Sequence, residues 1–100
     1  MYTPSYPGTS EDTKAKFDQQ LAAFARAHVG LGMACAKFAR TFADMGNLDR
    51  AAAEIAKAQN EYDHASALLR DIAGGLSLKE RASIDNEMAA LERLIDVLNG

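Results

Sequence analysis

Hydrophobic residues between Phe17 and Met45 recur at steps that alternate between four and three residues. This spacing is typical of a helix that packs lengthwise against another helix. The line contains Phe17, Leu21, Phe24, His28, Leu31, Cys35, Phe38, Phe42 and Met45, and small residues beside it form a second line of Ala22, Ala25, Val29, Gly32, Ala36, Ala39 and Ala43. The pattern predicts a helix over residues 11–45 whose wide apolar face contacts two neighbours.

Two further apolar lines at helical spacing predict a second helix over residues 48–73 and a third over residues 78–98. The second line is Leu48, Ala51, Ile55, Ala58, Tyr62, Ala65, Leu69 and Ile72, and the third is Ile84, Met88, Leu91, Ile95 and Leu98, flanked by Leu94. No segment alternates in the manner of a strand. The third helix is expected to return antiparallel to the second and cover the first two.

Only Gly46 and Asn47 separate the first two helices, so these helices must form an antiparallel hairpin. We expect several layers of the hairpin to set a large side chain against a small one, as interdigitated packing requires. The expected pairs are Phe42 with Ala51, Phe38 with Ile55, Cys35 with Ala58, Leu31 with Tyr62, His28 with Ala65, Phe24 with Leu69 and Leu21 with Ile72.

Capping residues support these boundaries. Thr9 or Ser10 is a suitable N-cap for the first helix, and Gly46 a suitable C-terminal glycine. Gly74-Gly75 is expected to end the second helix, and Ser77 with Glu80 forms a capping box before the third. We therefore predict an all-α antiparallel three-helix bundle over residues 10–100, with a long first helix and a disordered N-terminal tail over residues 1–9, which contain both prolines.

Residues 35–58 resemble one tetratricopeptide repeat, a helical hairpin of about 34 residues. The matching positions are Phe38, Ala39, Phe42, Gly46, Leu48, Ala51, Ile55 and Ala58, whereas Cys35 and Asp63 depart from the repeat pattern. The three-helix layout is also similar to microtubule-interacting and trafficking domains. Both families bind peptides or helices of partner proteins, so the resemblance implies an interaction module, although no ligand-contacting residue transfers by motif.

The net charge of −3 argues against a nucleic-acid ligand, which requires a basic face. A single cysteine excludes an internal disulfide. The N-terminus lacks the features of a signal peptide, and no apolar run approaches the roughly 20 residues of a membrane span. These features predict a cytoplasmic chain without membrane insertion.

Three residues could carry chemistry. Glu61 and His64 form a Glu-x-x-His pair of the kind used in di-iron bundles, but a second pair is missing, and His64 is expected to face water. His28 occupies a packing position, where Tyr62 or Ser66 could satisfy its ring and burial would keep it neutral. Cys35 fits a small buried hydrophobe. We expect no cofactor and no catalytic residue.

The leading hypothesis is a non-enzymatic interaction or adaptor module that binds a helix or peptide of a protein partner, with a homodimer as one form. Met33, Leu94 and Val97 are the candidate contact residues, because they are apolar residues outside the main packing lines. One alternative is a small metal- or cofactor-binding protein that uses His28 or the pair Glu61 and His64. A second alternative is a membrane-associated coiled-coil dimer.

Overall fold

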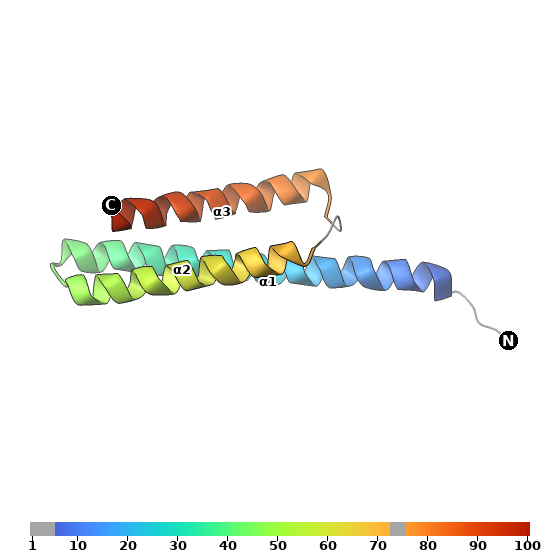
Figure 1. Ribbon diagram of the computed structural model, residues 1–100, viewed down its shortest axis with the longest axis horizontal. Helices are drawn as coiled ribbons and strands as arrows, with labels where there is room; N and C mark the ends of the chain where they lie inside the picture. Colours follow the sequence, from blue (N-terminus) through green and yellow to red (C-terminus); the bar gives the residue numbers. More distant parts are fainter. Residues whose placement is uncertain (1–5, 73–75) are drawn as a thin grey trace.

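Three α-helices build the molecule. The computed structural model describes residues 6–72 and 76–100, with side chains from residue 13 onward. The helices are α1 (Tyr6–Asp44), α2 (Leu48–Arg70) and α3 (Leu78–Asn99). α1 and α2 form an antiparallel hairpin, and α3 runs back along it antiparallel to α2 (Figure 1). The predicted all-α three-helix fold is confirmed, and all regular structure in the described ranges is helical.

The ends of α1 and α2 differ from the expected ones. α1 begins at Tyr6, so the predicted tail is helical from Tyr6 to Thr9, and Thr9 and Ser10 lie within the helix rather than capping it. Pro7 is compatible with this start because the first turn of a helix leaves its N–H groups unpaired in any case. α2 ends at Arg70, and the expected stop at Gly74-Gly75 lies outside the described residues.

The turn between α1 and α2 follows the expected chemistry. Gly46 has a φ of 81°, which an L side chain rarely adopts. Its N–H donates to the Ala43 carbonyl at 3.0 Å, and the Asn47 N–H donates to the Phe42 carbonyl at 2.8 Å. These two bonds satisfy carbonyls at the end of α1. The Asn47 side chain then accepts from the Arg50 N–H and caps α2, so two residues reverse the chain.

The predicted capping box at the start of α3 is also confirmed. The Glu80 N–H donates to the Ser77 hydroxyl at 3.1 Å, and the Ser77 N–H donates to the Glu80 carboxylate at 3.3 Å. Beyond the box, α3 buries Ile84, Met88, Leu91 and Ile95 as expected. Leu98 packs against the same core while half-buried.

Only part of the wide apolar face expected for α1 is buried: the second predicted line is, except for Ala43, whereas every second residue of the first line is exposed. The line of small residues forms the core side of the helix, through Ala22, Ala25, Val29, Gly32, Ala36 and Ala39. The predicted nesting of Phe24, Leu31 and Phe38 against α2 is wrong, because each of these side chains is more than half exposed. Leu48, expected in the α2 seam, is also exposed.

Gly32 explains why the small residues of α1, rather than the large ones, lie in the core. A Cβ atom added to Gly32 would lie 3.4 Å from the carbonyl oxygen of Ala58 and 2.7 Å from the Leu91 side chain. The backbone of α1 therefore approaches α2 and α3 at a distance that leaves no room for a larger residue. Large side chains are displaced to the rim of this contact, and the N-terminal end of α1 extends beyond both other helices (Figure 1).

Candidate functional site

The most prominent surface feature is a row of large apolar side chains along α1, which we call the outer stripe. Its members lie seven residues apart, and their exposed fractions are 58% for Phe17, 58% for Phe24, 56% for Leu31, 57% for Phe38 and 71% for Met45. A seven-residue interval corresponds to nearly two helical turns, so Phe17, Phe24, Leu31 and Phe38 share one side of α1, and Met45 follows them in the turn after the helix. Water contacts most of this row, although its residues are those that cores and interfaces prefer.

Small and polar residues fill the intervals of the outer stripe. Gln20, Ala27, Ala34 and Thr41 are all exposed, and with the five large residues they complete a line whose steps alternate between three and four. This is the spacing through which one helix packs along another. α1 thus carries two packing faces, one filled by α2 and α3 and one without a neighbour among the described residues.

The charged residues beside the outer stripe are few. Lys16, Lys37 and Asp44 are exposed along the edge that faces away from α2. Lys16 lies near the start of the stripe, whereas Lys37 and Asp44, which carry opposite charges, lie near its end. An antiparallel partner helix would bring the start of one stripe beside the end of the other.

The structure brings the three candidate chemical residues together. His28 of α1 lies beside Glu61 and His64 of α2, and one ligand atom from each of the three lies within 4.8 Å of the others. His28 Nδ1 is 3.0 Å from Glu61 Oε2, and the two imidazole centroids are 5.2 Å apart. The sequence pattern indicated each of these residues separately, but not their convergence.

Two expectations about His28 are wrong. Its hydrogen-bond partner is Glu61 rather than Tyr62 or Ser66, and its side chain is 32% exposed rather than buried. The cause is the rotation of α1 that places small residues in the core, since this rotation moves His28 toward the edge of the hairpin. His64 is exposed as expected, yet its ring packs beside that of His28.

Cys35 lies two turns further along α1, on the same edge as His28. Burial and the neighbouring Glu54 carboxylate raise the pKa of its thiol above the ordinary value. A raised pKa reduces the thiolate fraction at neutral pH, so the surroundings of Cys35 do not activate its thiol as a nucleophile. This agrees with its expected role as a small apolar residue, although the side chain is half-buried rather than fully enclosed.

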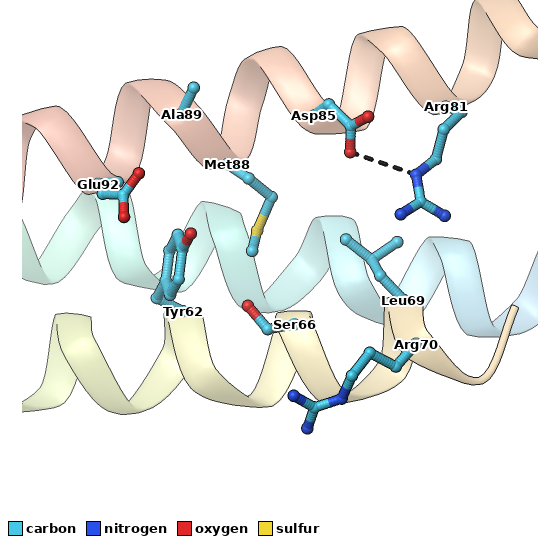
Figure 2. A pocket seen from close by; sticks show the side chains of 9 residues that line it. All are labelled: Tyr62, Ser66, Leu69, Arg70, Arg81, Asp85, Met88, Ala89 and Glu92. Atoms are coloured by element: carbon cyan, nitrogen blue, oxygen red, sulfur yellow. Dashed lines mark hydrogen bonds and ion pairs between the residues drawn. The ribbon is translucent and has the colours of Figure 1, made fainter.

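A groove separates α2 from α3. Figure 2 shows Tyr62 rising from α2 and Met88 reaching down from α3, with Arg81 paired to Asp85 on the α3 side. Burial and the Glu92 carboxylate raise the pKa of the Tyr62 hydroxyl above its ordinary value. Charges of both signs line this groove, so its electrostatics select neither an anion nor a cation.

The expected contact residues occupy different environments. Met33 is half-buried and packs against the core, contrary to its expected exposure, because α3 covers that side of α1. Leu94 is also half-buried against the core, whereas Val97 is 73% exposed. The outer stripe is therefore a larger apolar surface than the one formed by the expected contact residues. The sequence did not indicate it as a surface, because its residues were predicted to lie in the core.

Within residues 6–72 and 76–100, none of the helices has the continuous apolar length that a bilayer crossing requires. Comparison of the chain with protein-family models, with curated proteins and with solved structures finds no match. The resemblance to a tetratricopeptide hairpin stays a prediction.

Proposed function

We propose that this protein is a non-enzymatic helix-docking module, and that the outer stripe of α1 pairs with the α1 helix of a second copy. The observation that carries the proposal is the stripe itself, five large apolar residues at seven-residue intervals that are each more than half exposed. Contact with a partner helix would remove this apolar area from water at roughly 25 cal/mol per Å².

The exposed area approaches the lower size limit of a specific dimer interface. A large aromatic side chain presents about 150–250 Å² in full, so each member of the outer stripe leaves roughly 100 Å² in water. Two copies that cover each other's stripe would bury about 1,000 Å² from these side chains alone. That value reaches the size expected for a specific interface of about 1,000 Å², before the intervening residues are included.

The order of large and small residues favours an antiparallel pair. In one antiparallel register, Phe24 lies opposite Ala34 of the second copy and Leu31 lies opposite Ala27 of the second copy. Every large residue from Phe17 to Phe38 then meets a small or polar one, as close packing requires. A parallel pair would instead stack ring on ring and leave gaps between the alanines.

Charge complementarity selects the same register. It places Lys16 of one copy two residues from the level of Asp44 of the other, on the same edge of the contact, and the two-fold axis generates this pair twice. Such exposed pairs contribute no more than about 1 kcal/mol each, so their effect lies in specifying the alignment. A shift of the register by seven residues separates these charges. It also shortens the apolar contact or leaves large residues of one copy without a facing residue in the other.

Light scattering with a matched pair of variants tests the proposal. We expect a dimer mass for the natural chain and a monomer mass for Phe24→Glu, because the new carboxylate would be buried at the interface. Leu78→Glu is the control, since Leu78 is 91% exposed but lies on α3, away from the outer stripe. Circular dichroism should show helical content unchanged in both variants.

A charge exchange tests the register separately. Lys16→Asp should weaken the dimer by like-charge contact with Asp44, and the double variant Lys16→Asp with Asp44→Lys should restore it. A natural chain that stays monomeric at all concentrations would refute self-pairing. Sedimentation with anionic vesicles that is lost in Phe24→Glu would assign the stripe to a lipid surface and also overturn the proposal.

A further inference from the structure

The side-chain cluster at the edge of the α1–α2 hairpin has a chemistry that helix docking does not use. The chain contains only two histidines, and both lie in this cluster together with Glu61. We propose that His28, Glu61 and His64 form a binding site for a divalent transition-metal ion, for which Zn²⁺ is the appropriate probe. This inference is independent of the pairing of α1.

The distances suit a small ion with short bonds. Zinc binds imidazole nitrogen and carboxylate oxygen at about 2.0–2.2 Å, so two ligands in tetrahedral geometry lie roughly 3.3–3.5 Å apart. His28 Nδ1 lies 3.0 Å from one Glu61 oxygen and 3.3 Å from the other. The three ligand atoms span at most 4.8 Å, which modest side-chain rotations would close around one ion.

The donor set defines the class of metal. Two imidazoles and one carboxylate suit zinc, copper, nickel or cobalt, whereas calcium and magnesium prefer all-oxygen sites. Three protein ligands leave a fourth position for water. The half-buried setting of His28 and Glu61 supports affinity because part of the desolvation is already complete in the folded protein.

Two features of the fold hold the ligands in place. Glu61 and His64 are three residues apart on α2 and so project from the same side of the helix. Gly32 on α1 lets α2 approach closely, so that a Cβ atom at position 32 would be 3.3 Å from the Glu61 Cβ. Ala67 and Leu68 line the surface pocket beside the two rings, so apolar side chains flank the ligands on that side.

Calorimetric titration with Zn²⁺ of the metal-free chain is the first test. We expect one ion per chain, and a loss of affinity of at least about tenfold in His64→Ala, since removal of even an outer-shell partner costs about 10–100-fold. Glu61→Gln should weaken binding in the same way. Asp63→Asn is the control, because it removes a neighbouring exposed carboxylate that bonds to Gln59 outside the cluster.

Cobalt absorption distinguishes metal binding from a purely structural role of the cluster, because a structural role alone produces no such absorption. Co²⁺ bound to the natural chain should give visible absorption of a four-coordinate site, and His64→Cys should retain binding with added thiolate-to-cobalt charge transfer. Absence of Zn²⁺ and Co²⁺ binding to the natural chain would overturn the proposal. So would stoichiometric binding that persists unchanged in both His64→Ala and Glu61→Gln.

Discussion

Gly30 and Gly32 allow a direct test of the close contact that organises the bundle. Both lie in α1, two residues apart, and alanine at either position gains about 1 kcal/mol of helix propensity. At Gly30 a new methyl group meets no atom within 4 Å. At Gly32 the same methyl group would lie 2.7 Å from Leu91 Cδ2 and 3.4 Å from a backbone carbonyl.

The magnitudes follow from these distances. Gly30→Ala should stabilise the fold by about 0.5–1 kcal/mol, because only the propensity changes. Gly32→Ala gains the same propensity but overpacks a contact in which Leu91 is fully buried, which costs about 1–3 kcal/mol. The two variants should therefore differ by about 1–3 kcal/mol, with Gly30→Ala the more stable.

Urea unfolding at one fixed protein concentration measures this difference, since any dimer makes stability depend on concentration. In a thermal scan each kcal/mol corresponds to about 4–8 °C for a domain of this size. Equal unfolding free energies for the two variants would show that α2 and α3 do not approach Gly32 closely. Close backbone approach would then not be the reason that α1 buries its small residues.

Three further outcomes are expected. Ser77→Ala should cost about 1 kcal/mol in urea unfolding, because the α3 cap is lost. Ile84→Ala should cost about 2–5 kcal/mol, whereas Leu78→Ala at a 91% exposed position should change stability by less than about 0.5 kcal/mol. Glu54→Gln should lower the raised pKa of the Cys35 thiol toward its ordinary value, so that the pH profile of iodoacetamide alkylation moves to lower pH; an unchanged profile would contradict the influence of Glu54.

The sequence predicted the number of helices, the two-residue turn and the α3 cap because these depend on local chemistry. Gly46 adopts the positive φ that glycine tolerates, and Ser77 caps through its own side chain. The α3 core residues were also predicted, since α3 has a single apolar line. Such features can be predicted without knowing which residues the neighbouring helix brings into contact.

Local sequence features could not decide which face of α1 is buried. Two apolar lines lie side by side on that helix, and both satisfy the spacing of a packed seam. Hydrophobicity favours burial of the phenylalanines, whereas close approach of the backbones favours burial of the alanines and Gly32. Only burial of the small residues is compatible with the position of α3 against α1. The convergence of His28 with Glu61 was missed for the same reason, because it depends on the rotation of α1.

The length of α1 affects how the assembly can be measured. The chain extends over 70 × 23 × 15 Å and has a radius of gyration of 17.9 Å, against about 13 Å for a compact chain of this length. A rod of these proportions tumbles slowly and elutes early from a sizing column, at the position of a much heavier sphere. Elution volume would therefore suggest an oligomer even for an isolated chain, and only a mass measurement that does not depend on shape can count the copies.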